Sequence, residues 1–196
     1  MASYSLLNDL TTTLQHNLYH ALDTAADDNF GMTSATSEIV LESPQTADLE
    51  HAASKVSLYL YHMGINGHLR NQPMLSVGAQ GLMKPPLPFQ LKYLITPVNG
   101  DHFTHQLMLG RIIQYLYDNP ILTNSATLPM NDDKGGTTEL RIHPDNLSIE
   151  SLNQIWTAMS EPYRLSYSFT VDVVTIDSAK PPRAAHRVGG VAQSGS

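Results

Sequence analysis

The segment that decides the fold is residues 163–177, YRLSYSFTVDVVTID. From Leu165 to Val173, apolar side chains occupy every second position and mostly polar ones lie between them. This two-residue period predicts a β-strand, because successive side chains of a strand point to opposite faces. The predicted strand is longer than the usual five or six residues, so we expect part of it to run past the edge of its sheet.

Other segments predict further strands by the same criterion. Residues 86–96, PLPFQLKYLIT, alternate as a half-buried strand that ends at a proline, and shorter strands are predicted at 38–42, 56–61 and 138–143. Residues 45–54 are interpreted as an acidic connector. Together these segments indicate one mostly antiparallel sheet.

Helical spacing of apolar residues appears in three places. Residues 5–23 carry a leucine stripe, and residues 102–118 carry a second apolar stripe before Asn119-Pro120. Ser148 is placed as the N-cap of a third helix, whose buried face includes Trp156. The order of elements predicts the α+β class, with a mixed, mostly antiparallel sheet flanked by two or three helices.

The composition limits what the chain does. It has no cysteine, which excludes disulfides, thiolate metal sites and cysteine nucleophiles. Its net charge of −7 argues against nonspecific binding of nucleic acid. No apolar run is long enough to span a membrane, and no secretion signal is visible.

The charge is unevenly distributed along the chain. Residues 178–196 carry +3 from Lys180, Arg183 and Arg187, and the preceding residues carry −10, which together give the net charge. We therefore expect a single domain at 1–177, followed by a basic C-terminal arm rich in Pro, Gly, Ala and Ser. The arm either docks on an acidic surface or is a solvated tail.

Residues 58–73, LYLYHMGINGHLRNQP, form either a metal site, a catalytic turn or a structural part of the fold. Asn66-Gly67 favours a tight turn, and residues 68–71 are predicted to return as a short strand before a long loop at 71–86. Arg70 and Asn71 beside that loop either anchor it through backbone carbonyls or contact a partner.

No catalytic or cofactor motif is present in the sequence. His16 and His20 have the spacing of zinc ligands on a helix, but no glutamate completes an HExxH motif. There is no GxSxG, GxxxxGK or GxGxxG sequence. We therefore expect no enzymatic activity, no cofactor and no bound metal.

Four segments in a fixed order carry a resemblance to a known family. The segments, which lie between residues 58 and 177, are LYLYHMGINGHLRN, PLPFQLKYLIT, LGRIIQYLYDNPIL and LSIESLNQIWTAMSEPYRLSYSFTVDVVTID. The resemblance itself extends over about Tyr4 to Asp177. In this order and spacing they resemble the tail-terminator, or cap, family of extracellular phage-tail-like contractile injection systems, of the antifeeding-prophage and virulence-cassette type. No single segment is diagnostic.

The resemblance implies a phage tail-terminator-like fold and a structural role. Such a protein forms a six-fold ring that closes the baseplate-distal end of the inner tube and contractile sheath. Its partners would be itself, the tube protein and the sheath protein. The signature positions of the fold are Tyr59, Tyr61, Asn66, Leu91, Tyr93, Leu94, Thr96, Leu109, Gly110, Leu116 and Trp156.

Two alternatives remain open at this point. The chain is another tail or neck adaptor of the same kind of particle, or it is a small hydrolase with an unrecognised site. If the cap hypothesis holds, assembly takes place in the bacterial cytoplasm, and the particle is released or anchored. We expect the polar, edge-exposed part of residues 163–177, with the basic C-terminal arm after it, to join neighbouring subunits by strand addition.

Overall fold

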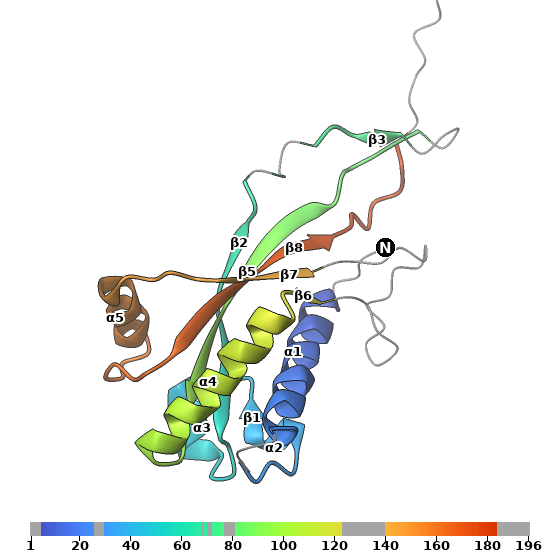
Figure 1. The fold of residues 1–196 in the computed structure, drawn as a ribbon. Coiled ribbons are helices and arrows are strands. Elements are labelled where there is room, and N and C mark those ends of the chain that lie inside the picture. Colours follow the sequence, from blue (N-terminus) through green and yellow to red (C-terminus); the bar gives the residue numbers. More distant parts are fainter. Residues whose placement is uncertain are drawn as a thin grey trace, which may run out of the picture.

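One six-stranded sheet organises the molecule (Figure 1). The computed structural model describes residues 5–25, 30–67, 69, 72–76, 81–122 and 140–183. The strands lie in the order β1-β2-β5-β8-β7-β6, and among them only β1 and β2 are parallel neighbours. They comprise β1 (Ile39–Val40), β2 (Val56–Ile65), β5 (Leu87–Pro97), β6 (Ile121–Leu122), β7 (Leu140–Pro144) and β8 (Tyr167–Ile176).

Helices cover one face of this sheet. The two long helices, α1 and α4, lie side by side across the lower part of the sheet in Figure 1. The helices are α1 (Leu6–Asp23), α2 (Ala35–Glu38), α3 (Pro44–Glu50), α4 (His102–Asp118) and α5 (Ile149–Ala158). The α+β prediction with a mostly antiparallel mixed sheet is therefore confirmed.

Side-chain caps fix where two of the helices begin. The Asp101 carboxylate accepts hydrogen bonds from the backbone N–H groups of Phe103 and Thr104 at the start of α4. At the start of α5, the Ser148 hydroxyl accepts from the N–H of Ser151, as the sequence predicts. Capping matters here because the first turn of a helix has no internal partners for its N–H groups.

The core lies between the sheet and the helices α1 and α4. Leucines of α1 meet apolar side chains from β2, β5 and β8, all of them buried. Tyr93 stacks on Phe169 with ring centroids 5.4 Å apart, and its hydroxyl forms a 2.8 Å hydrogen bond with Thr11 of α1. Burial raises the pKa of Tyr93 to about 12, although the Thr11 hydrogen bond lowers it.

The structure corrects the predicted acidic connector at 45–54. Most of that segment is helix α3, which begins at Pro44. Ser43 caps it by accepting a hydrogen bond from Thr46, and proline at the first helical position is favourable because its missing N–H needs no partner there. The strand predicted at 38–42 is correspondingly short, since only Ile39–Val40 pair with β2.

The strand predicted at residues 163–177, which is β8, also differs from its prediction. β8 begins at Tyr167, four residues later than expected, and it lies between β5 and β7 inside the sheet. It is therefore not a free edge to which a neighbouring subunit adds a strand along its whole length. Its predicted polar face is buried at Ser168 and Thr170.

The hairpin predicted after Asn66-Gly67 falls mostly on residues outside the described chain. The antiparallel partner of β2 is β5, which pairs with it from Val56 to Ile65. His68, Arg70 and Asn71 lie outside the described residues. The loop predicted at 71–86 contains a second, two-stranded sheet of β3 (Leu75–Ser76) and β4 (Leu82–Met83).

The sheet continues beyond the helices. We call this part the extension and define it as the described residues among 62–67, 72–76, 81–90 and 174–183. In Figure 1 it rises above α1 and α4 and ends at β3 and β4. We call the remainder of the described chain the body.

Candidate interaction surface

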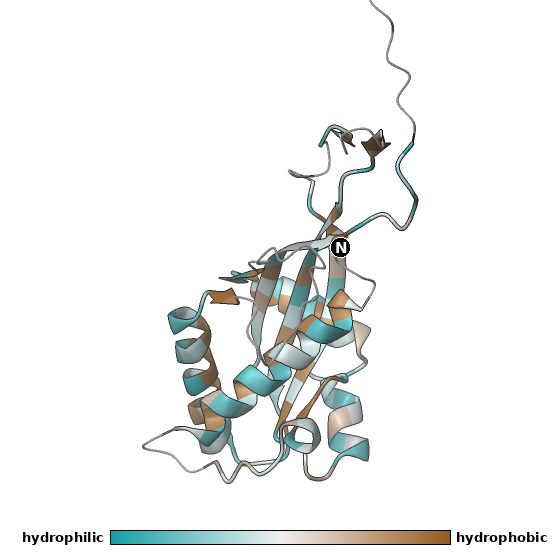
Figure 2. Ribbon diagram, turned by 90° about the vertical axis from the view of Figure 1, so that its right-hand side faces the viewer, coloured by the Kyte–Doolittle hydropathy of each residue, from teal (hydrophilic) through white to brown (hydrophobic). Residues whose placement is uncertain are grey.

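The extension exposes apolar side chains that no helix covers. Six large apolar residues on it have exposed fractions between 36% and 50%: Met63, Ile65, Met74, Leu75, Leu82 and Leu87. In Figure 2 the short strands at its tip appear as hydrophobic segments. Exposed apolar clusters of this kind usually mark interaction sites.

Two of these residues continue the core face of the sheet. Met63 is paired with Leu91, and Ile65 is paired with Phe89. Leu91 is fully buried in the core, and directly paired residues share a face of the sheet. The same apolar face is therefore covered by helices in the body and exposed in the extension.

The C-terminal segment returns to the tip of the extension. Leu82 of β4 and Arg183 exchange two backbone hydrogen bonds, of 2.9 Å and 2.8 Å. This antiparallel bridge joins residues that are far apart in the sequence. It places the first part of the predicted basic arm, including Lys180 and Arg183, beside β4.

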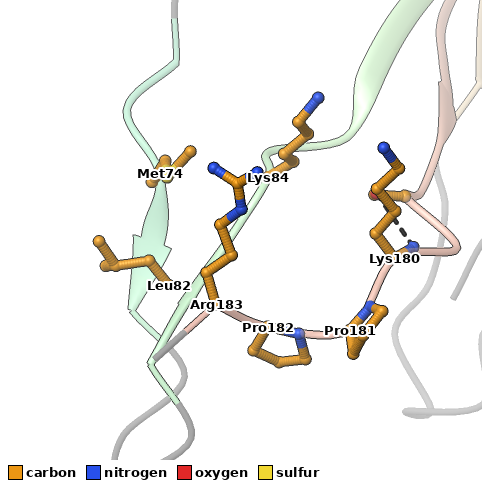
Figure 3. Close-up of a pocket in the computed structure, with 8 residues that line it drawn as sticks. Met74, Leu82, Lys84, Lys180, Pro181, Pro182 and Arg183 are labelled. Atoms are coloured by element: carbon orange, nitrogen blue, oxygen red, sulfur yellow. Dashed lines mark hydrogen bonds between the residues drawn. The ribbon is translucent and has the colours of Figure 1, made fainter. Parts of the chain in front are cut away.

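A groove lies between β4 and this returning segment (Figure 3). It has a volume of about 390 Å³. Lys84, Lys180 and Arg183 line it together with Met74 and Leu82. In Figure 3 the cationic ends of Lys84, Lys180 and Arg183 extend to the same side of the backbone. Sequence reasoning identified Lys180 and Arg183 but missed Lys84, because only the long-range bridge brings it to them.

The opposite face of the sheet holds a polar network in the body. The carboxylate of Asp145 accepts hydrogen bonds from Ser168 (2.9 Å) and Thr170 (2.6 Å). The Ser168 hydroxyl also lies 3.1 Å from the hydroxyl of Tyr61. These contacts explain why β8 buries polar side chains, since buried polar groups need partners. Burial raises the pKa of Tyr61, and the nearby Asp145 carboxylate raises it further, while the Ser168 hydrogen bond lowers it.

A partly buried ion pair lies at the other end of the body. Lys55 Nζ is 3.0 Å from the Glu38 carboxylate, which also accepts hydrogen bonds from the N–H groups of Thr33 and Ser34. Burial by itself raises the pKa of Glu38, but these hydrogen bonds and the Lys55 charge outweigh it and leave the pKa below its usual value. Glu38 is therefore an ionised structural group.

Most of the predicted signature positions are structural. All four in β5 are fully buried, and Trp156 is buried on α5: Leu91, Tyr93, Leu94, Thr96 and Trp156. Leu109 and Leu116 form the core stripe of α4, Asn66 is almost buried, and Tyr59 and Tyr61 are half-buried.

Gly110 differs from the other signature positions. It is exposed, and a side chain there would meet no atom within 4 Å. Seven residues on either side of it, Phe103 and Tyr117 are 70% and 80% exposed. This spacing places the three on one outer face of α4. The glycine is therefore not required by packing within the described chain.

The remaining candidate residues give no further site. Arg70, Asn71 and Arg187 lie outside the described residues. Within the described chain, one group has metal-ligand geometry: Glu42, Glu50 and His51, whose ligand atoms lie within 4.8 Å of one another. The two carboxylates are exposed, and a 3.2 Å hydrogen bond between His51 and Glu42 accounts for the proximity of these two side chains. No described helix is long and apolar enough to cross a bilayer.

The overall fold matches solved structures of particle components. The PVC sheath/tube terminator of an extracellular contractile injection system, in its extended state, matches with a TM-score of 0.61 and 18% identity; the match covers 97% of this chain and 64% of that one. The cap of the anti-feeding prophage, a tube-terminating cap, also matches with a TM-score of 0.61, at 17% identity over 93% of this chain and 59% of that one. This chain thus spans less than two thirds of either. Among curated proteins, none matches it.

The fold is therefore that of tail-terminator proteins, as the sequence predicts. Residues 9–189 match the Pvc16 N-terminal domain, and the chain belongs to that family.

Proposed function

We propose that this chain is a structural cap that closes the baseplate-distal end of the inner tube and contractile sheath of a phage-tail-like injection system. The observation that carries the proposal is the match of nearly the whole fold to two terminator structures, together with membership of the family. The proposal is made for a chain shorter than either terminator.

The proposed cap works by binding, without catalysis. Its partners are other copies of itself in a six-fold ring, the tube protein and the sheath protein. The exposed apolar extension supports this proposal, because such a surface is stabilised by covering it in an assembly. Assembly would take place in the bacterial cytoplasm, before the particle is released or anchored.

Locating the protein on the particle tests the proposal. Particles carrying an epitope-tagged copy are imaged after gold labelling, and we expect label only at the end opposite the baseplate. Particles from cells without the chain should have unregulated tube lengths. Label along the shaft or at the baseplate would contradict a cap, and normal tube lengths without the chain would contradict termination. Native mass spectrometry of the purified chain, alone and with tube protein, tests the six-fold ring.

A further inference from the structure

We propose that the groove at the tip of the extension binds an acidic, extended segment of a partner protein. This deepens the proposed function and rests on it in taking the partner to be another component of the same particle. The chemical argument itself depends only on the groove.

The cations of the groove differ from Lys55 and Arg164 of the body, which both form ion pairs. In the body, Lys55 is paired with Glu38, and Arg164 is paired with Asp48 and Glu161. Among the described residues, by contrast, the cationic groups of the groove form no ion pair.

Three positive charges therefore line one groove. Lys84 comes from the chain after β4, and Lys180 and Arg183 come from the returning segment. Among the described residues, no aspartate or glutamate lines the groove. Both Lys84 and Arg183 are exposed, so their charges are available to a partner. Complementary carboxylates would accelerate association and fix the orientation of the bound segment.

The apolar part of the lining selects the class of partner. Besides the three cations and Ser178, the described lining of the groove is apolar and consists of Met74, Leu82, Pro181 and Pro182. A protein segment that alternates acidic and apolar side chains matches both parts of this lining. A nucleic acid offers phosphates but no aliphatic side chains to contact Met74 and Leu82.

The shape also favours an extended segment. The groove is open, and its volume of about 390 Å³ holds a few side chains but not a folded element. Strand β4 already pairs with β3 on one side and Arg183 on the other. Recognition would therefore come from side-chain charge and apolar contact, with no strand added to β4.

Fluorescence anisotropy with the purified full chain tests this binding. The probe is a fluorescein-labelled peptide of Glu-Leu-Ser repeats, with Gln-Leu-Ser and Lys-Leu-Ser peptides of equal length as comparisons. We expect the acidic peptide to bind at least about ten-fold more tightly than the neutral one and to weaken with salt. Equal affinity for the acidic and neutral peptides would overturn the proposal. So would preferential binding of a labelled single-stranded RNA.

Charge reversal places the binding in the groove. The variant Lys84→Glu, Lys180→Glu, Arg183→Glu should lose at least about ten-fold in affinity for the acidic peptide. Lys92→Glu, which lies on β5 away from the groove, is the matched control and should change affinity less than two-fold. If the reversed variant is misfolded, as judged by its melting curve, the corresponding Gln variants replace it. Wild-type affinity in the groove variant would overturn the assignment.

The two proposals fail in different experiments. If the protein is found away from the particle ends, the cap function is wrong, whatever the peptide measurements give. If it lies at the ends but the groove variant binds the peptide as wild type does, only the groove inference is wrong.

Discussion

The body and the extension are built from the same strands but differ in what covers them. In the body, Leu58 of β2 is fully buried under the helices; in the extension, Ile65 on the same face of the same strand is 47% exposed. The cations differ similarly, since Lys55 and Arg164 of the body form ion pairs, whereas among the described residues the groove cations form none. The body therefore supplies the stability of the fold, and the extension keeps its apolar and charged groups available for a partner.

Replacing Trp156 should have the largest effect on stability. Its side chain is 1% exposed and packs edge-on against Tyr163, with ring centroids 6.3 Å apart. We expect Trp156→Ala to lower the free energy of unfolding by about 3–5 kcal/mol. Urea unfolding measures this change, and a loss below about 1 kcal/mol would show that α5 contributes little to the body.

Two substitutions in β2 test directly whether the body and the extension contribute differently to stability. Leu58→Ala leaves a cavity in the core and should cost about 2–5 kcal/mol of unfolding free energy. Ile65→Ala removes exposed atoms and should cost about 0.5 kcal/mol. Both are measured by urea unfolding of the isolated chain. Equal losses at the two positions would mean that the extension is part of the stabilising core.

The Glu38–Lys55 pair should make the body sensitive to acid. Because the pKa of Glu38 is lower in the folded state, its contribution is fully present above its unfolded pKa, near 4.5, and is lost as the pH falls through the folded value. Glu38→Gln should therefore cost about 1–3 kcal/mol at pH 7 and progressively less as the pH falls below 4.5. A loss that is independent of pH would rule out this linkage.

Truncation after Asp177 should have the smallest effect on the body. It removes Arg183 and with it the bridge to Leu82. We expect the melting temperature to change little, while the amide hydrogen of Leu82 exchanges faster in a hydrogen-exchange measurement. Unchanged protection at Leu82 would show that the bridge does not persist in solution.

Local sequence patterns predicted the elements whose stability is local. The α4 helix, residues 102–118, was predicted with its exact bounds because it has both a periodic stripe and an Asn-Pro stop. The strand at 86–96 was predicted to within one residue at each end. Helix α3 differs from its prediction: Ser43-Pro44 is a recognisable helix start, but the acidic composition of residues 45–54 favours a connector.

Local sequence patterns do not predict long-range contacts. Alternation in residues 163–177 continues through Leu165, but no strand pairs there, and Leu165 is 51% exposed. Nothing local shows that Asp145 satisfies the polar side of β8. Similarly, the charge count identified Lys180 and Arg183, but their meeting with Lys84 depends on one bridge between distant segments.

The continuity of β2, β5 and β8 from the body into the extension has a mechanical consequence. A pull on the tip along the strands loads neighbouring ladders in shear, so that many backbone hydrogen bonds resist together rather than parting one after another. The register shifts after Leu60 and after Phe89 interrupt these ladders locally, so fewer hydrogen bonds share the load at those two points. A force applied to the tip of the extension would therefore be transmitted along β2, β5 and β8 to the buried layer between the sheet and α1.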